Sequence, residues 1–272
     1  MTLDVEHSFT DDMPNYWDKF PEHIDDIDDF NNCKTELLNY IIELYGNKKL
    51  PNGDIFNLEY KYIDSFGYNL CFNNIRLGSD SILQIYWYWS RPLLIKNLID
   101  NDVKKYIAIH TGLSFYDFIK NYLKKAYTIG GHIIFPKERD RSMNINRGYS
   151  NKFIRDRFDL TLECIKRYYD NTEQSINDER YNPLGRVIYK NYEDFFKLFC
   201  NFKGFVDFFY LNPIVSEDYN SIKYFICNSN NNFLAEPLPR DYREWYELYE
   251  NQISFLEKRN ELIRIAYKQN KV

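Results

Sequence analysis

The stretch Tyr127-Thr128-Ile129-Gly130-Gly131-His132-Ile133-Ile134-Phe135-Pro136 is largely apolar and contains two adjacent glycines. A short apolar run bounded by turn-forming residues is typical of a strand buried on both faces. Glycine within such a run marks a break or a close approach of two backbones. We therefore predict a buried strand here, broken at Gly130 and Gly131.

The sequence on both sides of this strand has mainly helical periodicity. Downstream, Ser150 is a suitable N-cap for a helix over Asn151–Asp170, and upstream Ser114 can cap a helix over Phe115–Lys125. The last predicted helix runs from Tyr242 to about Gln269. Further helices are predicted at Cys33–Tyr45, from Ser79 or Asp80 through Trp89, and around Phe195–Phe202.

Two segments alternate apolar and polar residues, as half-buried strands do. They are Phe56–Tyr62 and Tyr68–Phe72, and they follow a turn at Lys49–Asp54, so a hairpin or meander is expected. We find no internal repeat and no long Gly/Ser or Pro linker. The predicted class is α+β, a predominantly helical single domain with a small antiparallel sheet.

The acidic charge is concentrated at the N-terminus. Residues 1–30 hold ten acids and one base, a net charge of −9, so residues 31–272 carry about +4 of the overall −5. We predict that residues 1–30 form a partly ordered acidic segment whose first dozen residues bury little apolar surface. Residues 31–272 are predicted to form one globular domain.

Composition and motifs exclude several classes of protein. The chain has 272 residues and 44% hydrophobic residues, but no apolar run of the roughly 20 residues that a membrane helix needs. The acidic start does not resemble a signal peptide, and five widely spaced cysteines without a CxxC pair favour reduced thiols and no zinc site. These features predict a cytoplasmic protein without membrane association.

Three strings carry a resemblance to a known family. They are Tyr127–Gly131, Asp156–Ile165 and Gly204–Phe209, and the turn Leu50–Gly53 adds to them. They resemble a family of bacterial and phage proteins described as a domain of unknown function, over roughly residues 45 to 265. The resemblance implies a shared fold, and it implies no activity.

No motif with an established mechanism is present. The chain lacks a phosphate-binding GxxxxGK[ST] loop, a GxSxG elbow, an HExxH pair and a GxGxxG turn, and its four histidines do not pair at ligand spacing. These absences indicate no cofactor and no metal, and they leave open whether the chain is an enzyme.

The segment Lys137–Arg157 is the strongest candidate for a binding site. It holds seven bases and three acids, a net +4 in an acidic protein, and five of the seven bases are Arg. Arg is suited to bidentate contacts with phosphate, and the segment precedes a predicted helix start, which favours anions. The candidate ligand-binding residues are Arg139, Arg141, Asn144, Asn146, Arg147, Arg155 and Arg157. The alternative is a solvated loop whose arginines pair with core carboxylates.

Four further residues are candidates for acid–base chemistry. Asp159 and Glu163 share a predicted helix face with Arg155, and they can serve as acid and base or form an intrahelical charge ladder. His132 and Asp207 are single polar residues inside apolar runs, so each is either catalytic or a satisfied core group. A buried carboxylate must be paired, and we therefore expect Asp207 to be buried against a cation or donor.

Two functional hypotheses follow. In the first, the basic segment binds or processes a phosphate-bearing ligand, a nucleotide or a nucleic acid, and the resemblance to phage proteins suggests a role in phage–host conflict by analogy. In the second, the chain is a noncatalytic interaction module, and its acidic N-terminus and basic segment contact a protein partner. The sequence does not indicate an oligomeric state.

Overall fold

The computed structural model describes residues 3–9, 11, 30–64, 67–82, 101–137, 145–150, 154, 157–226, 238–239 and 241–269. In these ranges the chain forms helices and a four-stranded sheet, which confirms the predicted α+β class. No helix in these ranges is long and apolar enough to cross a membrane. The α-helices are α1 (Phe30–Tyr45), α4 (Asn101–Thr111), α5 (Phe115–Ala126), α7 (Phe158–Asp170), α8 (Thr172–Asn177), α9 (Gly185–Val187), α10 (Glu193–Lys197), α11 (Phe202–Phe208) and α12 (Tyr242–Gln269).

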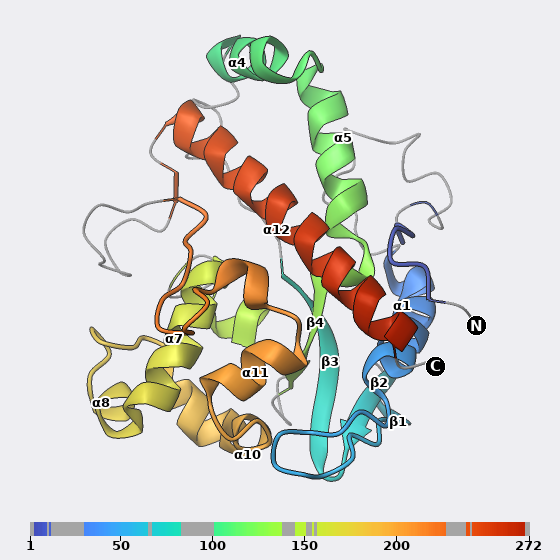
Figure 1. The fold of residues 1–272 in the computed structure, drawn as a ribbon, viewed down its shortest axis with the longest axis vertical. Coiled ribbons are helices and arrows are strands. Elements are labelled where there is room, and N and C mark those ends of the chain that lie inside the picture. The colour runs from blue at the N-terminus through green and yellow to red at the C-terminus, as the bar shows by residue number, and fades with distance from the viewer. Residues whose placement is uncertain are drawn as a thin grey trace.

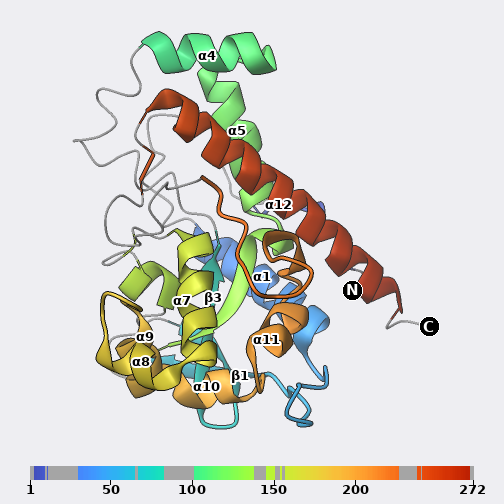
Figure 2. The ribbon, with the colours of Figure 1, turned by 60° about the vertical axis from the view of Figure 1, so that its left-hand side comes forward.

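The sheet is antiparallel and its strands follow one another in chain order. The strands are β1 (Glu59–Asp64), β2 (Gly67–Phe72), β3 (Ile75–Ser81) and β4 (His132–Pro136). In Figure 1 the sheet stands between α1 and the group formed by α7, α10 and α11. Helix α12 runs from the end occupied by α4 and α5 toward α1, and Figure 2 shows the same course from another side.

Strand β3 corrects a prediction. Ser79 and Asp80, which were expected to cap a helix, lie within β3 and pair with Ile134 and Ile133 of β4. Residues 83–89 of that predicted helix lie outside the described residues. The correction has a tertiary cause, because β4 is buried along its whole length and its backbone groups find their partners on β3.

The glycine pair makes the turn that leads into β4. Ile129–Gly131 form a 3-10 turn, and β4 begins at His132. A Cβ on Gly131 would lie 1.7 Å from the carbonyl oxygen of Ala126, and one on Gly130 would lie 2.1 Å from Oδ1 of Asn260. The pair is therefore required by two close approaches, as the sequence predicted in general terms.

Helix α12 holds this turn in place through two neighbouring side chains. Arg259 is fully buried and donates to the carbonyl oxygens of Gly130, His132 and Phe209. Asn260 accepts from the backbone N–H of Gly130 at 2.9 Å and donates to Thr128. One turn of α12 thus joins the start of β4 to the end of α11.

The region around Phe195–Phe202 is not one helix. Helix α10 ends at Lys197, Cys200 adopts a φ of 63°, and α11 begins at Phe202 with the Asn201 side chain accepting from the N–H of Gly204. The break turns both apolar runs toward one core, in which Phe199 contacts Phe205, Phe208 and Phe209 with ring centroids 5.2–5.3 Å apart.

The N-terminal residues pack more tightly than the sequence suggested. Leu3, Val5 and Phe9 are buried, so the prediction that the first dozen residues bury little was wrong for them. The Phe9 ring lies edge-on to Tyr40 of α1 at 5.4 Å, and the N–H of Phe9 donates to the carbonyl of Tyr127. Two of the acids contact bases of the chain itself, Glu6 with Arg264 and Asp11 with Lys124.

Replacing Phe9 by Ala is expected to lower the free energy of unfolding by about 3–5 kcal/mol, because a fully buried ring is removed. Urea unfolding measures the change. Glu6→Gln is the control, since the Glu6 side chain is 69% exposed and the loss of its ion pair should cost less than about 1 kcal/mol. Equal effects of the two substitutions would show that the N-terminal segment is not part of the core.

Candidate functional site

The predicted site residues fall into three groups by their description. Arg139, Arg141, Asn144 and Arg155 lie outside the described residues. Asn146 and Arg147 lie in a short π-helical turn, Ile145–Ser150, of which the side chains at these two positions are not described. The described side chains are those of Arg157 and of the four acid–base candidates, His132, Asp159, Glu163 and Asp207.

Arg157 and Asp159 form a buried ion pair at the start of α7. The two side chains are 3% and 0% exposed, and Nε of Arg157 lies 2.7 Å from Oδ1 of Asp159. A second contact joins Nη2 of Arg157 to Oδ2 of Asp159, and this oxygen also accepts from the N–H of Phe225 at 2.9 Å. Breaking one partner of such a pair leaves a buried charge uncompensated.

A chain of hydroxyl groups links the basic segment to the same pair. Ser150 and Thr161 share a hydrogen bond between their hydroxyl oxygens at 2.7 Å, and both side chains are buried. The Thr161 hydroxyl lies 3.1 Å from the carbonyl oxygen of Arg157, to which it can donate. Ser150 therefore does not cap a helix over Asn151–Asp170. Regular α7 begins at Phe158, after Arg157 has turned to meet Asp159.

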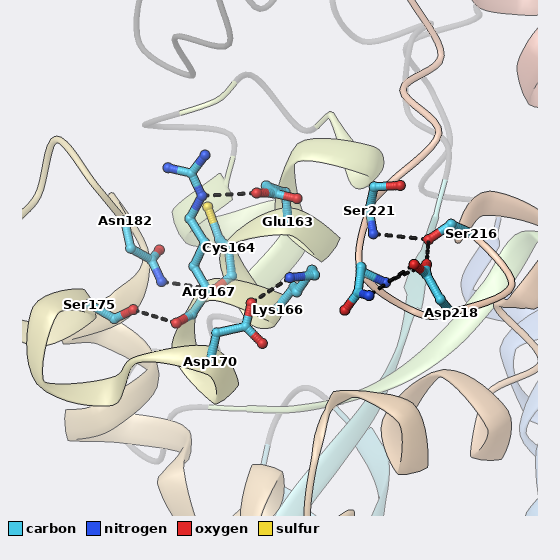
Figure 3. Close-up of polar contacts among 11 residues, drawn as sticks. Glu163, Cys164, Lys166, Arg167, Asp170, Ser175, Asn182, Ser216, Asp218 and Ser221 are labelled. Atoms are coloured by element: carbon cyan, nitrogen blue, oxygen red, sulfur yellow. Dashed lines mark hydrogen bonds and ion pairs between the residues drawn. The ribbon is translucent and has the colours of Figure 1, made fainter.

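Glu163, one turn further along α7, has a partner of its own. Nε of Arg167 donates to Oε1 of Glu163 at 2.9 Å, and Nη1 of Arg167 donates to the carbonyl of Tyr181 (Figure 3). Tyr224 hydrogen-bonds to Glu163, and burial together with the Glu163 charge raises the pKa of that phenol. In Figure 3 the second ion pair of α7, Lys166 with Asp170, joins other side chains than Glu163 and Arg167.

The neighbouring segment Tyr224–Phe225 was missed by sequence reasoning. It supplies a phenol beside Glu163 and a backbone N–H to Asp159, and its carbonyl at Phe225 accepts from Asn251 of α12. Tyr224 and Phe225 lie more than 60 residues from Asp159 in the chain. A backbone donor at that separation has no signature in the sequence, although the apolar Phe225–Ile226 pair indicates burial.

His132 occupies a different position in the fold. Its side chain is 2% exposed, and its ring packs against those of Phe9 and Tyr127 at 6.1 and 6.0 Å. Its carbonyl oxygen accepts from Arg259. These contacts match a histidine that helps to build the core at the start of β4.

Asp207 is paired as predicted but is not buried. Its side chain is 39% exposed, and it accepts from Asn212 and Tyr219 at 2.7 Å each and forms an ion pair with Lys203. Partial burial by itself would raise the pKa of Asp207, but the hydrogen bonds from Lys203, Tyr219 and Asn212 outweigh it and lower the pKa. The error arose because α11 turns its Asp207 face outward while Val206 and Phe208 on either side are buried.

The described candidates therefore form an α+β framework with two separate polar clusters. One is the α7 cluster of Arg157, Asp159, Glu163, Arg167 and Tyr224, and the other surrounds Asp207. No group of three or more His, Cys, Asp or Glu with the geometry of a metal site occurs among the described residues.

The chain belongs to a family that is defined by sequence alone. A family model with the description "Family of unknown function (DUF6994)" matches residues 3–263, which confirms the resemblance seen in the sequence. The match begins at residue 3, so it includes the acidic segment that precedes the strings quoted above. Comparison with curated proteins and with solved structures gave no significant match.

Asp159→Asn is expected to lower the free energy of unfolding by roughly 3–5 kcal/mol, because it leaves the buried Arg157 guanidinium without its carboxylate. Asp170→Asn is the matched control on the same helix. The Asp170 side chain is 47% exposed, and its ion pair with Lys166 should contribute less than about 1 kcal/mol. Chemical unfolding of both variants checks the difference, and a cost below about 1 kcal/mol for Asp159→Asn would contradict the buried pair.

Proposed function

We propose that the chain binds a phosphate-bearing ligand, a nucleotide or a nucleic acid, through the basic segment that ends at Arg155. The support comes from charge. Lys137–Arg157 carries a net +4, and Arg, the residue best suited to bidentate phosphate contacts, provides five of its seven bases. The competing interpretation neutralises these arginines with core carboxylates.

The pairing on α7 is the observation that carries the proposal. Asp159 and Glu163 are the carboxylates that follow the basic segment most closely on α7, and each is engaged by another base, Arg157 and Arg167 respectively. With Arg157 set aside, the segment still has six bases against three acids, a net +3. Neither of these two carboxylates is available to neutralise that excess.

The same pairing divides the candidate residues by role. Arg157 and Asp159 are assigned to support, because their charged groups face one another in the core. Ligand contact is assigned to Arg139, Arg141, Arg147 and Arg155, with Asn144 and Asn146 as hydrogen-bonding groups. Glu163 can act on a ligand only by leaving Arg167 and Tyr224, so the proposal is one of binding and does not require catalysis.

The alternative, a protein-interaction module that uses the acidic N-terminus, has less support. Two acids of that segment, Glu6 and Asp11, make ion pairs with Arg264 and Lys124 of the same chain. Such contacts hold the segment to the body of the molecule and withdraw part of its charge from any partner.

Replacing Arg139 and Arg147 together by Ala is expected to abolish or weaken ligand binding without loss of the cooperative unfolding transition. The control is the Lys104→Ala, Lys105→Ala variant, which removes the same charge from the exposed surface of α4. Thermal shift against a nucleotide panel tests small ligands, because a ligand that binds only the folded state raises the melting temperature. Titration of RNA and DNA at several salt concentrations tests nucleic acids.

The outcomes separate the two ligand classes. For a nucleic acid, affinity falls steeply with salt, and the Arg variant should reduce the slope of log K against log salt by about one for each phosphate contact that is lost. For a nucleotide, the salt dependence is shallow and the melting temperature rises. If wild type, Arg variant and Lys control all behave alike with every ligand, the phosphate proposal fails.

A further inference from the structure

A second feature of the fold, independent of the basic segment, is the enclosure of one lysine. Lys48 lies between α1 and β1, and its Nζ donates to the carbonyl oxygen of Phe208, the last residue of α11, at 2.8 Å. The same Nζ lies 4.4 Å from the ring centroid of Phe208 and 4.1 Å from that of Tyr210. The ammonium group is thus held by a neutral acceptor and two aromatic faces.

The backbone around this lysine adopts uncommon conformations. Asn47 has a φ of 62° and Tyr210 a φ of 57°, in the left-handed region that bulky residues rarely occupy. Tyr210 is the costlier of the two, and this conformation places its ring over Lys48. Strained residues persist only where the surrounding structure determines them, and they gather at functional positions.

Lys203 provides a comparison within the same region. It also lies over a tyrosine with positive φ, Tyr219, at 4.6 Å, but it forms a direct ion pair with Asp207 and its side chain is 59% exposed. Lys48 feels Asp207 only through space. The two lysines therefore share an acid and a ring type, and they differ in whether the ammonium touches a carboxylate.

This difference sets the two amines apart chemically. Burial lowers the pKa of Lys48 to about 8 against the opposing effect of Asp207, whereas the hydrogen bonds to Asp207 and Tyr219 raise the pKa of Lys203. The remaining ionisable groups around Lys48 are the phenols of Tyr45 and Tyr210, and Arg259 lies behind Tyr45 as a second cation. At pH 8, about half of the Lys48 side chains carry a neutral, nucleophilic amine.

We propose that Lys48 is a site of N-acylation by small activated acyl donors of the acyl phosphate class. The neutral amine attacks the acyl carbon, a C–N amide bond forms, the bond from the acyl carbon to the phosphate oxygen breaks, and inorganic phosphate leaves. The proton released from nitrogen passes to water. The product is uncharged, so the modification removes the cation from the two rings and loosens the contact between the Lys48 loop and the end of α11.

Acetyl phosphate is the probe, applied to the full chain between pH 6 and pH 10, with the acetylation of Lys48 and Lys203 quantified by peptide mass spectrometry. The rate at Lys48 should rise with a midpoint near pH 8. At pH 7.5 it should exceed the rate at Lys203 by on the order of tenfold, because the larger free-amine fraction outweighs the lower basicity of Lys48. In urea the preference should disappear, since it depends on the folded environment.

Asp207→Asn gives an independent readout at a half-exposed position. Because the Asp207 charge raises the pKa of Lys48, its removal should increase the rate at Lys48 at pH 7. A Lys48 that reacts no faster than Lys203 in the folded chain would overturn the proposal, as would a preference that persists in urea or a rate that Asp207→Asn leaves unchanged.

Discussion

Arg259 is a cation placed in the apolar interior, and the arrangement of the elements around it follows from the need to satisfy its donors. Its side chain is fully buried, and burial lowers its pKa. Among the described residues its partners are three backbone carbonyls and the hydroxyl of Tyr45, with no carboxylate. A buried charge without a counter-ion is tolerated only when fixed dipoles replace its hydration. The carbonyls of Gly130, His132 and Phe209 must therefore converge on one point of α12.

That convergence explains why two glycines occur together before β4. The chain has to approach α12 so closely at Gly130 that Asn260 fills the space of a Cβ, and it has to turn against the end of α5 at Gly131. The turn then delivers five buried residues into β4, which pairs with β3 and so closes the sheet. The glycine pair, the buried strand and the long C-terminal helix are consequences of one packing requirement.

The sequence predicted those elements whose signals are local. The C-terminal helix begins and ends where its periodicity indicated, and Ser114 caps α5 by accepting from the N–H of Asp117. The predictions failed where a distant partner decides the conformation. Asp80 pairs with Ile133 about 50 residues away, and Phe9 depends on Tyr40 and Tyr127 for its burial. The candidate site behaved in the same way, because charge counting identified α7 as important but could not tell which base each carboxylate meets.

The pairing of charges gives a better guide to function in this chain than the rarity of a residue in its local sequence. His132 and Asp207 drew attention because they interrupt apolar runs, yet one builds the core at the start of β4 and the other is held by three surface donors. Asp159 and Glu163 are satisfied by Arg157 and Arg167, which leaves the excess positive charge of the preceding segment without those two counter-ions. Lys48 differs from Lys203 for the related reason that a neutral carbonyl stands where a carboxylate would hold its proton. In each case the reactive or binding group is the one whose charge the fold leaves least compensated, because that group gains most from an external partner.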